Sequence, residues 1–150
     1  YLSELILDKL IFEEIRESQK LVYSAGYFTS LNSLPTANHT MYFYFKTDPK
    51  KKDLVFDQID QILLKIKNNN FDDKYLTNAK KKYINDLEQS KQSNNFWISV
   101  ILNRFFDGEK FSTIENIDKN INSITKEDIS NYFKNSFNDN FVKASFLPKE

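Results

Sequence analysis

Histidine, aspartate and glutamate are among the side chains of this sequence that could serve as metal ligands or as general acids and bases. The only histidine is His39, whereas a zinc peptidase site needs two or three imidazoles, or imidazoles with a carboxylate, held together. No His-Glu-x-x-His pattern or its inversion occurs. The count leaves room for a Ser-His-Asp triad, but no Gly-x-Ser-x-Gly element is present to carry it. We therefore interpret His39 as a surface histidine at the start of a strand.

Three glutamates lie close together near the N-terminus, at Glu13, Glu14 and Glu17. In a helix, positions 13 and 17 share one face and position 14 points elsewhere. Arg16 and Lys20 lie among them, which is more typical of an exposed, charge-paired helix edge than of a carboxylate site. We interpret the cluster as a solvated surface.

The sequence also lacks other common elements of catalytic sites. It has no cysteine, which excludes disulfides, cysteine nucleophiles and thiolate zinc sites. Its two glycines cannot form a Walker loop or a Gly-x-Gly-x-x-Gly turn, which excludes those phosphate-binding loops. We expect no catalytic residue, no metal ligand and no cofactor in this chain.

Charge and hydropathy limit the partners that the chain can bind. Lys plus Arg number 21 and Asp plus Glu number 21, so the formal net charge is zero. Nucleic-acid binding relies on a surplus of cations on one face, and the lysine run at 80–82 is interpreted as a solvated helix face. No apolar run approaches the roughly 20 residues that a spanning helix needs. We therefore expect neither a nucleic-acid partner nor a membrane partner.

Hydrophobic periodicity predicts the elements that position the polar residues. Apolar residues at three- and four-residue steps predict a helix over about 2–18. Branched and aromatic residues predict strands over 21–29 and 39–47, paired as an antiparallel hairpin. Gly26, inside the first strand, indicates a bulge or a close approach of another backbone segment. Further helices are expected after Asp48 and Pro49, after Asp72 or Asp73, over 96–102 and after Thr125, with a last strand over 142–146.

The order of these elements, helix, strand, strand, several helices, strand, indicates the fold. In the second strand Met41, Phe43 and Phe45 share one face, and Tyr42 and Tyr44 share the other. The last strand must return to the same sheet, because a lone strand cannot bury itself. The sequence therefore predicts an α/β fold of the α+β type, a two-layer sandwich in which a mainly antiparallel sheet has helices packed on one face. No internal repeat or long linker divides the 150 residues, so we expect one domain.

The segment around Arg16 and Tyr23 carries a resemblance to a known family. Arg16 lies near the end of the first predicted helix, and Tyr23 follows in the next strand after six intervening residues. Around this pair come an aromatic strand, a second strand ending in Asp48-Pro49, a run of helices containing Asn94-Asn95-Phe96-Trp97, and Thr125-x-x-Asp128 before the last strand. This arrangement resembles the C-terminal, non-zinc half of the M16 peptidases, a zinc family with an inverted metal-binding motif.

The resemblance implies that residues 1–150 form a single M16 C-terminal-type domain, a fragment of a longer chain. M16 enzymes are built from related α/β units that form two halves around a closed chamber. Zinc is expected in the N-terminal half, held by His-x-x-Glu-His and a distal Glu. The implied partners are that zinc-bearing half, in the same chain or in a partner subunit, and a peptide substrate. Arg16 and Tyr23 are the implied substrate-binding residues, in contact with the peptide backbone near the scissile bond.

Physical chemistry is consistent with these two roles. An arginine offers five donors in a rigid fork that suits peptide carbonyls, and a tyrosine hydroxyl can donate to a developing oxyanion. An arginine in the last turn of a helix is also favoured by the helix dipole alone. For a shared role, the Arg16 guanidinium and the Tyr23 phenol have to converge on a common cavity wall. We expect the peptide to bind in an extended form along an exposed sheet edge, by strand addition.

Two other functions are alternatives. The first is a catalytically inactive M16-like structural or assembly module, which a His-x-x-Glu-His motif elsewhere in the full-length protein would argue against. The second is an unrelated α/β binding module whose Tyr42 and Tyr44 strand face docks a protein partner. A fold without the order strand, strand, helices, strand would favour that second alternative.

Overall fold

The computed structural model describes residues 1–32, 36, 38–107, 116–137 and 141–147. Its elements in chain order are α1 (Leu2–Ile11), the π-helical segment η1 (Phe12–Ser18), β1 (Val22–Asn32), β2 (Asn38–Thr47), the 3-10 turn η2 (Pro49–Lys51), α2 (Lys52–Lys67), α3 (Asp73–Ser90), α4 (Asn94–Asp107), α6 (Ile117–Ser123) and α7 (Lys126–Ser136). The described part of the chain is thus mostly helical with one small sheet, an α+β arrangement as predicted.

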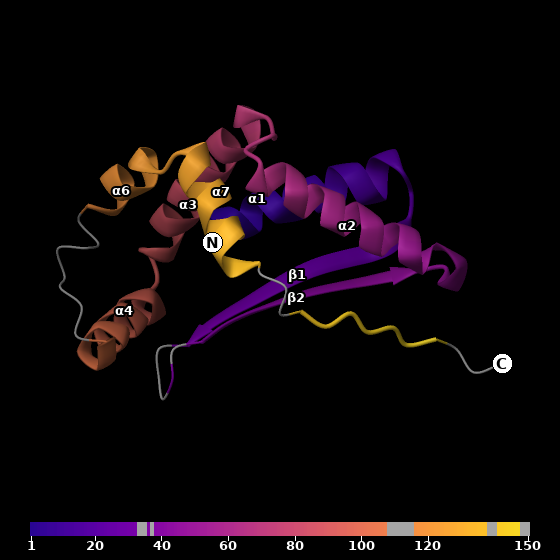
Figure 1. Cartoon of the computed structure of the whole chain (residues 1–150). Coiled ribbons are helices and arrows are strands. Elements are labelled where there is room, and N and C mark those ends of the chain that lie inside the picture. The colour runs from indigo at the N-terminus through magenta and orange to yellow at the C-terminus, as the bar shows by residue number, and fades with distance from the viewer. Residues whose placement is uncertain (33–35, 37, 108–115, 138–140, 148–150) are drawn as a thin grey trace.

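The sheet is the predicted antiparallel hairpin of β1 and β2, and the helices lie on one side of it (Figure 1). α1 and η1 contact β1, α2 contacts α1 and α7, α3 contacts α1, and α6 contacts α3. None of the helices in the described residues is long and apolar enough to cross a membrane. The two-layer arrangement with helices on one face is confirmed.

The hydrophobic core lies between this helical layer and the inner face of the hairpin. Its completely buried side chains come from three helices, and they are Ile6, Leu7, Val55, Ile62, Ile66 and Phe133. On the sheet, Ala25, Tyr27, Phe43 and Phe45 pack against them, while Tyr42 and Tyr44 are exposed. The alternation predicted for the second strand is therefore confirmed.

Side-chain caps fix the starts of the helical segments. The Asp48 carboxylate accepts the N–H of the residue two positions on at 2.8 Å, and Asp72 does the same for α3. At α7 the Thr125 hydroxyl accepts the N–H of Asp128 at 3.2 Å, while the Asp128 carboxylate accepts the N–H of Thr125 at 2.8 Å. These reciprocal bonds form the predicted capping box.

The first helix differs from the prediction beyond Ile11, where the chain continues as the π-helical segment η1. Ile11 and Ile15 are both buried, and their four-residue spacing suits an α-helix as well as this segment. The N–H of Leu21 donates to the carbonyl of Ile15 at 3.1 Å, which closes the segment. Hydrophobic spacing predicted the buried face correctly but not the helix type.

The predicted last strand over 142–146 is wrong. Residues 141–147 have no strand pairing, and the sheet of the described residues has only two strands. Val142 and Phe146 are 93% and 99% exposed, so the alternating apolar side chains bury almost nothing. Lys143 anchors the segment to α2, because its Nζ lies 2.7 Å from Asp60 Oδ2 and 5.4 Å from the centroid of the Phe56 ring. A side-chain anchor to a helix thus takes the place of backbone pairing with β2.

Candidate functional site

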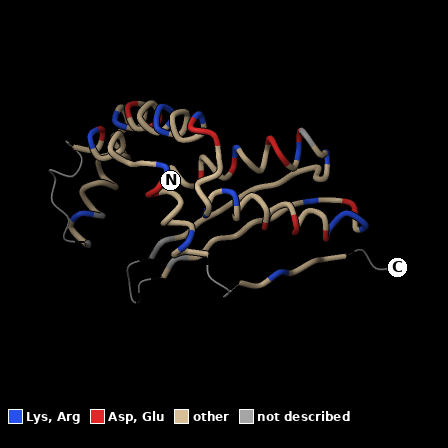
Figure 2. Tube along the Cα trace, turned by 45° about the horizontal axis from the view of Figure 1, so that its top comes forward, with Lys and Arg blue, Asp and Glu red and all other residues tan. Residues whose placement is uncertain are grey.

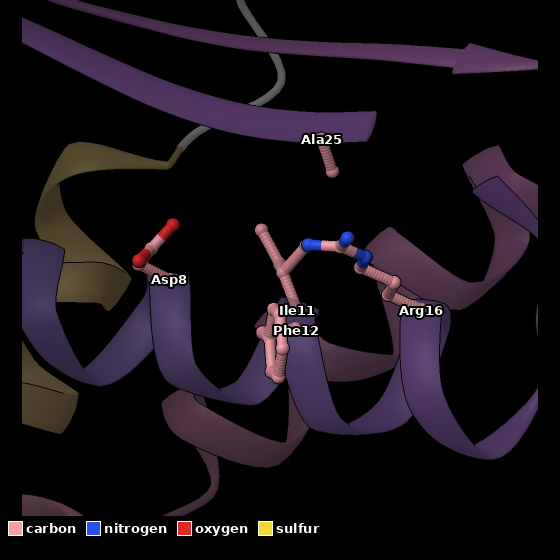
Figure 3. A pocket seen from close by; sticks show the side chains of 5 residues that line it. All are labelled: Asp8, Ile11, Phe12, Arg16 and Ala25. Carbon is pink, nitrogen blue, oxygen red and sulfur yellow. The ribbon is translucent and has the colours of Figure 1, made fainter. Parts of the chain in front are cut away.

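Arg16 lies in η1, and its exposed side chain turns back along the helix (Figure 3). The guanidinium carbon lies 5.1 Å from the centroid of the Phe12 ring, a cation–π contact. Asp8, Ile11, Phe12, Arg16 and Ala25 line a cavity of about 30 Å³ between the helix and β1. A cavity of that size holds at most a few water molecules, which is far too little space for a peptide.

Tyr23 owes its position to a shift in the register of the hairpin. Val22 lies opposite Thr47 and Ser24 lies opposite Lys46, so Tyr23 is an extra residue in β1. Without this bulge, Tyr23 would share the inner face with Ala25 and point at the helices. Val22 is instead buried and Tyr23 is 71% exposed. The bulge therefore directs the phenol of Tyr23 away from the core.

The two predicted site residues do not line one cavity. Arg16 lines the cavity beneath Ala25 on the helical side of β1, and Tyr23 is not among the lining residues. Both lie near the start of β1, since η1 contacts that strand and the connection between them is short. In the described residues β1 pairs with β2 alone. Arg16 and Tyr23 therefore lie on opposite sides of a strand whose other edge has no described partner.

The glutamate cluster is engaged in packing the helices together. The Tyr75 hydroxyl donates to Glu13 at 2.6 Å and Lys9 approaches the same carboxylate at 3.2 Å. Lys65 of α2 lies 2.6 Å from Glu14. The hydrogen bond from Tyr75 holds the pKa of Glu13 below its ordinary value. Burial, followed by the bond to Glu13, raises the pKa of Tyr75. Glu13 and Glu14 are therefore half-buried and paired with donors from α1, α2 and α3, whereas the sequence predicted a solvated surface, which holds for Glu17.

The side of the hairpin away from the helices carries a row of residues that we call the outer sheet face, and all of them are exposed except the half-buried Gly26. The outer sheet face consists of Tyr23, Ser24, Gly26 and Phe28 from β1 and of Tyr42, Tyr44 and Lys46 from β2. The rings of Phe28 and Tyr42 lie 6.3 Å apart across the ladder. Figure 2 shows charged residues along the helices, whereas the two strands are almost free of them.

Gly26 allows a close approach by a side chain and not, as predicted, by backbone. An ideal Cβ at Gly26 would lie 2.3 Å from both Cζ and Oη of Tyr44, the residue opposite it in the ladder. The Tyr44 ring therefore lies across β1, in space that any other residue at position 26 would occupy. The sequence predicted a bulge or a close backbone approach at Gly26, whereas the bulge lies at Tyr23 and the approaching group is the Tyr44 side chain. The position of Asp8 in the Arg16 cavity was also missed, although the eight-residue spacing places both on one helix face.

No group of three or more His, Cys, Asp or Glu side chains that could hold a metal ion exists in the part of the chain that the structure describes. His39 lies in β2, and its side chain is outside the described residues. The prediction that this chain carries no metal site or cofactor therefore stays a prediction.

The fold is shared with solved structures of proteases. A protease from Helicobacter pylori superposes with a TM-score of 0.73 at 14% identity, over 92% of this chain and 35% of that one. A conserved protein from Enterococcus faecalis V583 gives 0.74 at 18% identity, over 89% and 32%. The periplasmic protease PqqL from Escherichia coli gives 0.71 at 15% identity, over 89% and 15%. The chain thus spans about a third or less of each of these proteins. At such identities the likeness shows the fold alone.

The family follows from the sequence itself. Residues 1–83, more than half of the chain, match the family described as the peptidase M16 inactive domain. The chain belongs to this family, which confirms the predicted resemblance. The family match outweighs the missing last strand, the feature that would have favoured an unrelated α/β binding module. No curated protein matches the sequence.

Proposed function

We propose that this domain binds the substrate peptide of an M16-type zinc metallopeptidase, opposite a zinc site carried by the N-terminal half of the full-length protein. The family and the shared fold with proteases support the setting. The observation that carries the proposal is the placement of Arg16 and Tyr23 beside the start of β1, one on each side of the edge that has no partner among the described residues.

Arg16 and Tyr23 can reach the same peptide along the edge of β1, although they do not line a common cavity. An extended peptide that adds to β1 continues the sheet, with its backbone hydrogen-bonded to the strand. Tyr23 reaches such a peptide from the outer side, where its hydroxyl can donate to a peptide oxygen. Arg16 reaches it from the helical side once its guanidinium leaves the Phe12 ring, a contact worth only about 0.5–1 kcal/mol at an exposed site. In this proposal Arg16 and Tyr23 meet the peptide at the edge of a strand and not at the wall of a common cavity.

The zinc-bearing half supplies the reaction in this proposal. That half would hold the zinc, which when bound would supply activation of water and polarisation of a carbonyl. The present chain contributes donors that hold the peptide and stabilise charge on the carbonyl oxygen as it develops. Neither Arg16 nor Tyr23 exchanges a proton with the substrate in this scheme.

The test is steady-state cleavage of a peptide by the full-length protein and its variants. Arg16→Ala and Tyr23→Phe are each expected to lower kcat/KM on the order of 100-fold, the effect of losing one oxyanion donor. Both side chains are exposed, so the free energy of unfolding should stay within about 0.5 kcal/mol of wild type. The zinc content per chain should equal that of wild type.

Matched controls separate these roles from a general loss of charge or hydroxyl groups. Lys81→Ala removes an exposed cation from α3, and Thr77→Ala removes an exposed hydroxyl from the same helix. Both controls should cleave at the wild-type rate. If Arg16→Ala and Tyr23→Phe also cleave at that rate, the assigned roles are wrong.

A further inference from the structure

We propose that Tyr44, lying across Gly26, forms a platform for a large apolar side chain of an extended peptide added to β1, and that Lys46 pairs with an acidic side chain two residues along the same peptide. This specificity site rests on the proposed function, because it takes the β1 edge as the place of the peptide. It adds a sequence preference that the contacts of Arg16 and Tyr23 do not supply.

The Tyr44 ring is directed toward the edge of β1 that lies away from β2. Tyr44 belongs to β2, yet its Cζ and Oη occupy the space above Gly26 in β1. The Tyr44 ring therefore extends from β2 across to β1. Tyr44 is 63% exposed, so its face is open to a ligand in this structure.

The absence of a side chain at Gly26 gives a peptide direct access to that ring. Strands in a sheet lie about 4.7–4.9 Å apart, and alternate side chains of an added strand project on its outer side. A residue with a Cβ at position 26 would separate a peptide side chain from Tyr44. With glycine there, a large apolar side chain opposite position 26 packs on the ring itself. Phe28 and Tyr42 continue the aromatic surface beside it.

Charge determines the kind of peptide that suits this face. Lys46 is the one charged side chain among the described residues of the outer sheet face, which has no acidic side chain. Ser24, opposite Lys46, is small, so the lysine chain can extend over β1 toward the edge. Lys46 is two residues from Tyr44, the spacing at which side chains of an added strand recur on one side. The face therefore complements a peptide with an apolar and an acidic residue at alternate positions.

Binding of labelled peptides to the full-length protein tests the proposal by fluorescence anisotropy. The probes carry Phe-x-Glu or Glu-x-Phe, since both directions along β1 have to be tried, and matched probes carry Ala in place of Phe or Lys in place of Glu. A metal chelator keeps the peptides intact. Partial burial of a phenyl ring predicts a roughly tenfold preference for Phe over Ala in the better direction.

Two variants remove the platform in different ways. Tyr44→Ala deletes the ring, and Gly26→Ala displaces it, because the new Cβ cannot lie 2.3 Å from the Tyr44 atoms. Both should reduce the preference for Phe to less than about twofold, while Lys46→Glu should reverse the preference for Glu over Lys. Leu64→Ala, which removes an exposed apolar side chain from α2, should keep both preferences.

The outcomes distinguish this site from the proposed function. An unchanged preference for Phe in both Tyr44→Ala and Gly26→Ala overturns the platform, even where Arg16 and Tyr23 prove essential for cleavage. A lost preference together with wild-type cleavage by the Arg16 and Tyr23 variants supports the platform and refutes the proposed function. Protection of Tyr44 from hydroxyl-radical labelling in the peptide-free protein also overturns the platform, because another segment or a second copy then covers the face.

Discussion

Replacing Phe133 with alanine should remove a large part of the stability of this domain. Phe133 of α7 is fully buried, with 0% of its surface exposed. Its ring stacks on Phe137 at 5.2 Å with an interplanar angle of 5°, and Phe137 lies 5.8 Å from Phe43 of β2. This row of three rings connects the helical layer to the sheet. Phe-to-Ala changes at such sites cost about 3–5 kcal/mol, through lost burial and the cavity that remains.

That cost is large compared with the total stability of about 5–15 kcal/mol that is typical of a domain. For a chain of this size it corresponds to a Tm lowered by roughly 6–20 °C. Urea unfolding followed by circular dichroism measures the free energy change, provided that the slope with urea stays constant. Phe105→Ala in α4 is the matched control, because that ring is 82% exposed, and it should change stability by less than about 0.5 kcal/mol. A loss of under about 1 kcal/mol for Phe133→Ala would refute the packing of α7 described above.

Two further predictions concern pH and metal. The hydrogen bond from Tyr75 lowers the pKa of Glu13 below 4.5 in the folded state. The stability that this bond contributes is therefore present above that pH and is lost as the pH falls through the folded pKa. The destabilisation by Tyr75→Phe, about 1 kcal/mol at pH 6, should therefore shrink at pH 2.5 in urea unfolding, and a constant difference would contradict the assignment. The 150-residue chain, purified without chelator, should contain far less than one zinc per chain by elemental analysis, and a stoichiometric zinc would contradict the prediction that it holds no metal.

The local signals in the sequence predicted the elements well because they act through neighbouring residues. Asp48 and Asp72 accept hydrogen bonds from N–H groups two residues away, and Thr125 and Asp128 bond to each other. These contacts depend on the local chain alone. The alternation of Phe43 and Tyr44 likewise predicted the two faces of β2, since a strand with one covered face must alternate.

The sequence-based predictions failed where the structure of a segment depends on contacts with residues distant in the sequence. Alternation over 142–146 predicted a strand, but alternation does not identify the partner of a segment. Both outer edges of the hairpin are unpaired among the described residues, and Lys143 is held instead by Asp60 of α2. The bulge at Tyr23 was also hidden, because a regular alternation from Val22 would have placed Tyr23 on the inner face with Ala25 and Tyr27. Only the register against β2 shows that one extra residue reverses this placement.

The two proposed contacts should differ in how they affect catalysis, and this difference follows from their places on the sheet. Tyr23 would act on the carbonyl whose charge changes during the reaction, so its hydroxyl should stabilise the transition state more than the bound peptide. Tyr44 would touch a side chain that is the same in both states. Loss of the Tyr44 ring should therefore raise KM with little change in kcat, whereas loss of the Tyr23 hydroxyl should lower kcat. The bulge and Gly26 would thus place two phenols on one sheet face, one for the reacting carbonyl and one for the selection of the peptide.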